Sequence, residues 1–271
     1  MNQLPKLVTF DGEARSGKGT IVQATKDYLR DECGLNVMLI DRGQAFRALV
    51  VAATQRGVDV HDPAQIDAFL ADETNLEYAT QFVKNVYHMP KDERDALLYT
   101  NEVGENSARI GARPASQIFV IGLTKKWMKD ADNEGYDVVL IDGRALEAIA
   151  CEMDREKTCE YVLGLYFTCD ATVGARRTLG YAATPYDELD ETQKTEVDAF
   201  VVQINARNHA DKTREVERLI PPAGAVTYAL PDLPKTLASS PRPMLILDTS
   251  AELSKEAMAK PVARLVAQAL G

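Results

Sequence analysis

Residues 12–20 form a glycine-rich loop with the residue types that bind a polyphosphate. The run reads Gly12-Glu13-Ala14-Arg15-Ser16-Gly17-Lys18-Gly19-Thr20. Gly12 and Gly17 permit the backbone angles and the close approach that successive amides need to surround phosphate oxygens. Lys18 supplies a point charge for the β- and γ-phosphates, and the hydroxyl of Thr20 or Ser16 is placed to reach Mg²⁺. These residues predict a site for a nucleoside triphosphate and its metal ion.

The ending of this loop departs from the strict phosphate-loop pattern, because Gly19 separates the lysine from Thr20. The resulting GKGT ending is similar to the form seen in nucleoside monophosphate kinases. A simple strand-turn-helix with a solvated Lys18 is the alternative. Phosphate binding is favoured because an apolar run at Leu7–Asp11 precedes the loop and a helical pattern at 17–30 follows it. The first turn of such a helix presents bare N–H groups that attract an anion.

A second candidate set follows the clearest buried strand of the sequence. The apolar run Asp137–Ile141 ends in Asp142-Gly143-Arg144. We expect this strand to lie beside the first one, so that Asp142 and Arg144 emerge next to the phosphate loop. Asp142 could then hold a water bound to Mg²⁺, and Arg144 could hold a phosphate. The alternative is an Asp-Gly turn with a solvated arginine.

Arg47 is a third candidate, because it follows a second short apolar run at Asn36–Ile40. Asp41 is expected to cap the next helix, which places Arg47 about one turn into it. Ligands of open α/β sheets bind near the carboxyl ends of strands, where this arginine would lie. A solvated helix residue is the alternative.

Arg207, Asp211 and Arg214 are spaced i, i+4 and i+7 within a densely charged segment, 188–218, that is expected to be largely helical. This spacing predicts that all three lie on one helical face. A solvated ion-pair face is the usual meaning of the pattern. Two arginines around one carboxylate, in a chain with a phosphate loop, favour a functional lid instead.

The remaining pattern completes an α/β fold with a five-stranded parallel sheet and helices on both faces. Residues 161–168 and 244–248 are the fourth and fifth strands, whereas residues 72–100 favour no single structure. The segment Pro221–Pro243 carries half of the chain's 12 prolines and is expected to be an insertion or a long connection. Further helices are expected at 102–110, 114–132, 171–178 and 254–270.

Composition narrows the class of protein. The 271 residues are 45% hydrophobic and 27% charged, as is ordinary for a globular protein. A net charge of −10 argues against nucleic acid or an anionic membrane as the main partner. Neither an 18-residue apolar run nor a leader at Met1–Lys6 is visible, so a cytoplasmic protein is expected. The four cysteines lack CxxC spacing and are expected to be reduced thiols, with a zinc site or disulfides as the rarer alternative.

Together these motifs resemble the cytidylate kinase family of nucleoside monophosphate kinases over most of the chain. No single motif after the loop is very specific for this family, but the order and the spacing of the motifs together are. The resemblance rests on the GKGT loop, Asp41-Arg42-Gly43 with Arg47, Glu102-Val103, Asp142-Gly143-Arg144, Ala175-Arg176-Arg177, the Arg207/Asp211/Arg214 set and Leu247-Asp248-Thr249-Ser250.

The resemblance implies a single P-loop kinase domain, 1–271, with an acceptor-binding insertion at about 60–115 and a lid at about 170–220. It implies ATP and Mg²⁺ at the loop, a nucleoside monophosphate across the cleft, and a lid that closes over both. The residues implied in these roles are Arg47, Arg144 and Arg214 for the acceptor phosphate, Arg207 as an active-site lid arginine, Asp211 at the nucleoside, and Arg176 and Arg177 near the ATP.

Most differences from the family pattern lie at the positions with which the family recognises the pyrimidine base. The family's serine is Ala108 here, its arginine after the proline is Gln117, and its aspartate after Gly-Arg is Ala145. Arg42 also replaces a serine, and residues 147–161 and 223–242 look inserted. A kinase of the same fold with a different or modified phosphorylated acceptor is therefore an alternative, and a nucleotide-binding regulator without turnover is another. The oligomeric state does not follow from the sequence.

Overall fold

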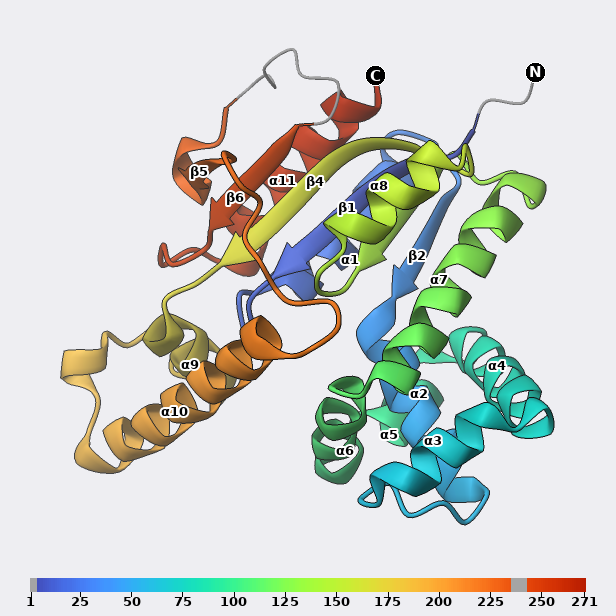
Figure 1. The fold of residues 1–271 in the computed structure, drawn as a ribbon. Coiled ribbons are helices and arrows are strands. Elements are labelled where there is room, and N and C mark those ends of the chain that lie inside the picture. The colour runs from blue at the N-terminus through green and yellow to red at the C-terminus, as the bar shows by residue number, and fades with distance from the viewer. Residues whose placement is uncertain (1–3, 235–242) are drawn as a thin grey trace. The chain divides into compact units, whose positions relative to one another are not determined.

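The computed structural model describes residues 4–234 and 243–271 (Figure 1). Part of the segment 223–242 and the start of Met1–Lys6, both discussed above, therefore lie outside the described residues. The chain contacts divide into two compact units. Unit 1 comprises residues 1–40, 128–213 and 218–271, and unit 2 comprises residues 41–127 and 214–217.

Unit 1 is built on a six-stranded sheet with the order β2-β3-β1-β4-β6-β5. β1 lies at its centre and pairs in parallel with β3 and β4, with Phe10 opposite Asp142 and Gly12 opposite Phe167. This register brings the carboxyl ends of the three strands to one edge of the sheet. The strands are β1 (Lys6–Gly12), β2 (Val37–Asp41), β3 (Val138–Asp142), β4 (Glu160–Thr168), β5 (Val226–Ala229) and β6 (Met244–Asp248).

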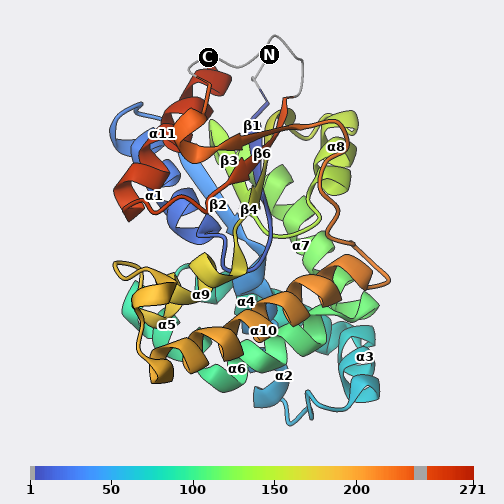
Figure 2. The ribbon, with the colours of Figure 1, turned by 90° about the vertical axis from the view of Figure 1, so that its left-hand side faces the viewer.

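Helices cover both faces of this sheet, as Figure 2 shows for α1 and α11 on one side and α8 on the other. The central strands are continuous apolar runs because both of their faces are buried. Side chains of α1 and α11, such as Ile21 and Val262, join Val8 and Leu165 in the main core cluster. The flanking helices are α1 (Lys18–Asp31), α8 (Glu147–Arg155) and α11 (Lys255–Leu270).

Two further helices of unit 1 carry the segment expected to act as a lid. They are α9 (Ala171–Leu179) and α10 (Glu191–Thr213), joined by a stretch with a short 3₁₀ turn at Tyr186–Glu188. Ala175 of α9 and Val197 and Ile204 of α10 form a separate small core with Ala14 of the phosphate loop. The helices therefore pack against one another and against the loop through apolar contacts.

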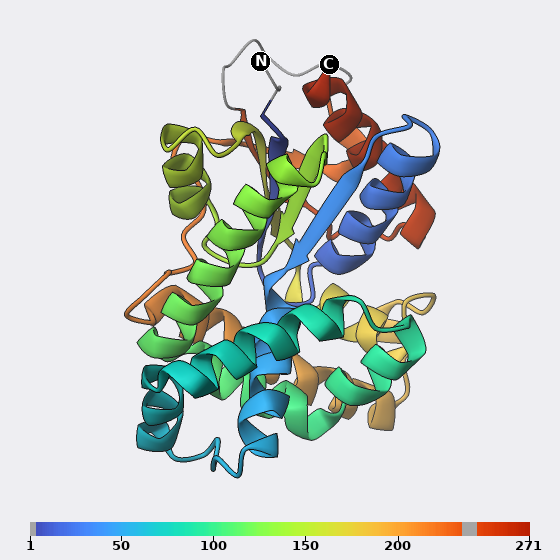
Figure 3. The same ribbon diagram turned by 90° about the vertical axis from the view of Figure 1, so that its right-hand side faces the viewer.

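Unit 2 is helical and has its own core, in which Leu49, Ile66, Val83 and Leu98 are fully buried. Its helices are drawn from blue to green in Figure 3. They are α2 (Arg42–Gln55), α3 (Pro63–Ala71), α4 (Glu73–Tyr87), α5 (Lys91–Leu98), α6 (Asn101–Gly111) and α7 (Pro114–Asn133), the last of which passes into unit 1 at Met128.

The predicted α/β class with a parallel sheet is confirmed, and all five predicted strands are present. The count of five was wrong, because the proline-rich segment also contributes β5, a strand of four residues at the edge of the sheet. Residues 72–100, where the pattern favoured no structure, are occupied by α4 and α5. A short edge strand that pairs with one neighbour carries little periodic signal, which explains why β5 was missed.

The helix that carries the charged face ends earlier than the spacing predicted. α10 stops at Thr213, so Arg207 and Asp211 lie on it but Arg214 does not. The expectation that all three share one helical face was therefore wrong for Arg214. The physical reason lies in residues 214–217, which leave the helix, cluster with unit 2 and include Glu217 in a left-handed conformation at φ 50°.

The four cysteines are free thiols, as expected. Burial raises the pKa of the Cys159 thiol to about 12, so it is protonated and unreactive at neutral pH. Within residues 4–234 and 243–271, none of the helices combines the length and the apolar character that crossing a bilayer requires.

Candidate functional site

The phosphate loop leaves β1 at Gly12, whose φ of 132° is accessible only to glycine. The next amide, that of Glu13, donates to the carbonyl of Phe167 at 2.9 Å. A Cβ at position 12 would overlap that same carbonyl oxygen. Gly12 is therefore required so that the loop can turn closely over the end of β4.

The loop ends in a helix whose first turn is left open. Gly17, with φ 77°, precedes α1 and provides no side-chain cap. The main-chain N–H groups of residues 16–19 have no hydrogen-bond partner among the described residues. Ser16 uses its own hydroxyl to donate to the carbonyl of Glu13 at 3.0 Å, which closes the loop on itself. Four bare amides at a helix N-terminus form a site for an anion.

Lys18 points to the end of β3, where it forms an ion pair with Asp142 and donates to the carbonyl of Gly143 at 2.9 Å. The expected meeting of the loop with Asp142 is thus present within unit 1. An Asp142 carboxylate oxygen also lies 4.0 Å from where a Cβ of Gly19 would be, so this carboxylate faces the first turn of α1. Thr20 is exposed in the same turn.

This donor set suits Mg²⁺ better than a transition metal. Asp142 and Thr20 offer oxygen atoms, and Mg²⁺ is commonly held by one or two protein oxygens together with water and phosphate. In the described part of the chain, no three His, Cys, Asp or Glu side chains are grouped to hold a metal ion by themselves. A metal ion held by Asp142 and Thr20 would therefore need further ligands, such as water or a bound anion.

Asp11 is a buried carboxylate, 6% exposed, that joins the phosphate loop to the loop carrying Arg144. One of its oxygens accepts from the amides of Gly12, at 2.6 Å, and Ala145, at 3.0 Å. The other accepts from the amide of Leu146 at 2.7 Å. Burial raises the pKa of Asp11, although the three N–H groups and nearby Lys18 oppose the rise. Ala145 has a positive φ of 56°, which these bonds help to hold.

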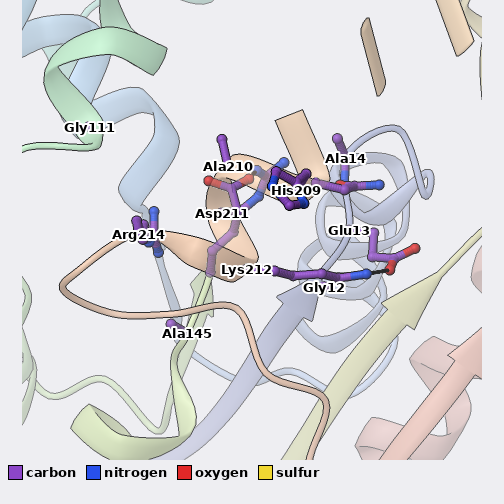
Figure 4. A network of polar contacts seen from close by, with 12 residues as sticks. Gly12, Glu13, Ala14, Gly111, Ala145, His209, Ala210, Asp211, Lys212 and Arg214 are labelled. Atoms are coloured by element: carbon purple, nitrogen blue, oxygen red, sulfur yellow. Dashed lines mark hydrogen bonds and ion pairs between the residues drawn. The ribbon is translucent and has the colours of Figure 1, made fainter. Parts of the chain in front are cut away.

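The end of α10 is fastened to the phosphate loop by two polar contacts, and Figure 4 shows the one between Lys212 and Glu13. Lys212 reaches Glu13 at 2.7 Å, and the Asn208 side chain accepts from the amide of Ala14 at 2.8 Å. On the same helix, Asp211 forms an ion pair with Arg144, and both side chains are largely buried. Arg207 of this helix is exposed. The structure thus brings Arg144 and Asp211 together as members of one unit.

The guanidinium groups of Arg176 and Arg177 in α9 are bound by other residues of the protein. Arg176 pairs with Glu252 at 2.6 Å and donates to the carbonyl of Ala182 at 3.2 Å. Arg177 donates to the carbonyls of Thr249 and Ala251 at 2.8 and 2.5 Å. These arginines therefore shape the segment 249–252, and Thr249 in turn donates its hydroxyl to the carbonyl of Ser16 in the phosphate loop.

In unit 2, Arg47 is half-buried and its guanidinium carbon lies 4.7 Å from the centre of the Tyr99 ring. Asp41 caps α2 as predicted, by accepting from the amide of Gln44 at 2.9 Å. Arg214 also belongs to this unit, and its Nε donates to the carbonyl of Glu217 at 2.6 Å. Two of the three arginines implied for an acceptor phosphate thus lie in unit 2, whereas Arg144 lies in unit 1.

Most polar side chains near the altered base-reading positions are already engaged. Ser107 donates to the carbonyl of Gly104, Arg109 contacts His61 and Asn106, and Arg113 forms a two-point ion pair with Asp67. Gln117 differs from them. Its amide nitrogen donates to the carbonyl of Gly111, but its amide oxygen is buried without a partner among the described residues.

Comparison with known proteins identifies the family. The family model described as cytidylate kinase matches residues 8–232. The chain belongs to the cytidylate kinase family. A cytidylate kinase of Pseudomonas fluorescens is 24% identical over 83% of this chain and 88% of its own length. A cytidylate kinase of Methylococcus capsulatus is 25% identical over 84% of this chain and 90% of its own length.

Some residues that hold the site of this cytidylate kinase family member were missed by sequence reasoning. Asp11, Asn208 and Lys212 were given no role, although each makes a side-chain contact that fixes a loop. For Asp11 a signal was present, because a carboxylate that ends an apolar strand needs partners if it is buried. For Asn208 and Lys212 the sequence offers no comparable signal, since their partners are more than 190 positions away.

Replacing Asp11 with Asn should destabilise unit 1 by about 2 kcal/mol or more, because an amide has one acceptor oxygen and its NH₂ group would face a main-chain N–H. The free energy of unfolding from urea titration measures this. Asp27→Asn, on a partly exposed position of α1, is the matched control and should change the value by less than about 0.5 kcal/mol. Equal stability of the two variants would contradict the role given to Asp11.

Proposed function

We propose that this member of the cytidylate kinase family transfers the γ-phosphoryl group of ATP to a nucleoside monophosphate similar to CMP or dCMP. The observation that carries this proposal is the open first turn of α1, with four unpartnered amides beside the Lys18 ammonium. Such a site recognises phosphates rather than a base, so the family supplies the nature of the acceptor. The curated relatives named above are themselves called cytidylate kinases.

Phosphoryl transfer asks little covalent chemistry of the protein, because an oxygen of the acceptor phosphate is already a competent nucleophile. Positioning and charge neutralisation are what the side chains must provide. In this proposal the amides of residues 16–19 and Lys18 hold the phosphates of ATP, with Gly12, Gly17 and Gly19 giving the loop its close approach. Arg47, Arg144 and Arg214 hold the acceptor phosphate, Asp211 contacts the nucleoside, and Arg207 adds positive charge from the lid. No general base is required.

Mg²⁺ would be held through the Thr20 hydroxyl and, by way of a bound water, the Asp142 carboxylate. When bound, it neutralises charge on the phosphate oxygens. Arg176 and Arg177 are assigned a supporting role near the ATP, because they hold the segment 249–252 against the phosphate loop through Thr249.

The cations assigned to phosphates are paired with carboxylates in this structure. Lys18 pairs with Asp142, and Arg144 pairs with Asp211, with side chains that are 13–17% exposed. In this proposal, phosphate oxygens replace the carboxylates as partners of these cations. Substrate binding would therefore exchange one set of charge-assisted bonds for another, rather than requiring bare buried cations.

In this proposal, fewer polar side chains are available to select the nucleobase than in the family pattern. Ala108 and Ala145 cannot form side-chain hydrogen bonds, which supports a looser pocket or a modified acceptor as the second candidate. Gln117 supports an amino-bearing base, because the buried amide oxygen without a partner can accept from an exocyclic amino group. Cytosine carries such a group and uracil does not.

Lys18→Ala should leave a folded protein with turnover reduced by about 10³-fold, since a cation at the transferring phosphate is worth that order in rate. Coupled detection of ADP release measures turnover, and circular dichroism checks folding. Lys26→Ala removes the same charge from the same helix and serves as the matched control. Near-normal turnover of the Lys18 variant would refute the phosphate-loop assignment.

We expect measurable phosphorylation of CMP or dCMP, with weaker selectivity over UMP than a full hydrogen-bonding pocket gives. Values of kcat/KM for CMP, dCMP, UMP and AMP measure this. A preference for CMP over UMP of about 10⁴ would show a complete base-reading pocket and contradict the expectation. Absence of activity on all four, with ATP still bound, would favour either the kinase with another acceptor or the regulator without turnover.

A further inference from the structure

A buried ion pair fastens the segment after α10 to the start of α2. Nη2 of Arg42, the first residue of α2, lies 2.7 Å from Oε2 of Glu217. The two side chains are 3% and 10% exposed. Glu217 ends the segment Arg214–Glu217, which clusters with unit 2, although the chain on either side of it clusters with unit 1. The pair is therefore one charged contact that joins this short segment to the unit with which it clusters.

Glu217 also orients Arg214. Its backbone is left-handed, at φ 50°, a conformation that non-glycine residues rarely adopt without support. In this conformation its carbonyl accepts from Nε of Arg214 at 2.6 Å. One residue thus has its side chain held by Arg42 and its main-chain oxygen directed at the Arg214 guanidinium.

A stabilising role alone does not explain an ion pair in this place. Removing two charges from water offsets most of their attraction, so apolar side chains of similar size would stabilise a buried contact as well or better. A paired arginine and carboxylate also fix the orientation of the two side chains, because their hydrogen bonds form only in a defined geometry. Arg42 stands, moreover, where the family pattern has a serine, so this anchor is one of the departures from that pattern.

We propose that Arg42 and Glu217 are positioning residues that hold Arg214 in unit 2, the unit that also carries Arg47. This inference rests on the proposed function, in which both Arg47 and Arg214 hold the acceptor phosphate. It assigns the pair to acceptor binding and not to ATP binding, because the phosphate loop and Lys18 belong to unit 1. The pair acts through Arg214 and does not itself contact the acceptor.

A double-mutant cycle tests the inference. Glu217→Gln removes the charge but keeps the shape of the side chain, and should raise the KM for CMP about tenfold while the KM for ATP changes by less than about twofold. In an Arg214→Ala background the same change should have little further effect, because the residue through which it acts is gone. Equal effects in both backgrounds, or equal changes in the two KM values, would overturn the proposal.

A second measurement does not depend on turnover. Arg42→Ser, which restores the residue of the family pattern, should speed amide hydrogen exchange across residues 214–219 in the substrate-free protein. Asp95→Asn breaks an exposed ion pair with Lys91 in the same unit and serves as the control, with no change expected at 214–219. Unchanged exchange in the Arg42 variant would refute the anchor. A wild-type protein without kinase activity would refute the proposed function, and this experiment would still decide whether the anchor exists.

Discussion

The arrangement of the candidate site depends on one buried carboxylate. Asp11 accepts three main-chain N–H groups from two loops that are about 130 residues apart in sequence. A buried carboxylate is costly unless its oxygens are satisfied, so the two loops are held in the one geometry that satisfies them. Because β1 lies between β3 and β4, that geometry sets the phosphate loop beside Asp142 and Arg144.

Charge compensation is the second feature that organises the site. The chain carries a net charge of −10, yet the residues assigned to phosphate binding are cations. Each of the two that are central, Lys18 and Arg144, is paired with a carboxylate of its own unit. An acidic protein can therefore hold cations at this site without accumulating local positive charge, and under the proposed function phosphate oxygens would replace these carboxylates as partners of the cations.

The sequence allowed the sheet and the phosphate loop to be predicted because both have strong local signals. A continuous apolar run that ends in glycine marks a buried strand, and the spacing of Gly12, Gly17 and Lys18 marks the loop. The position of Arg214 could not be predicted, because α10 ends at Thr213 and the following segment contacts residues far away in sequence, as in the pair Arg42 and Glu217. The contacts of α10 with the loop depend in the same way on partners far away in sequence, whereas β5 is a strand of four residues at the edge of the sheet and carries little periodic signal.

The proposed function depends first on the binding of ATP phosphates by the open turn of α1. Backbone amide chemical shifts during titration with Mg²⁺ and a non-hydrolysable ATP analogue test it most directly. We expect large, saturable shifts for the four amides of Ser16, Gly17, Lys18 and Gly19, with a smaller response in the edge strand β5, which is separated from β1 by β4 and β6. Saturable binding that leaves these four amides unshifted would contradict this expectation.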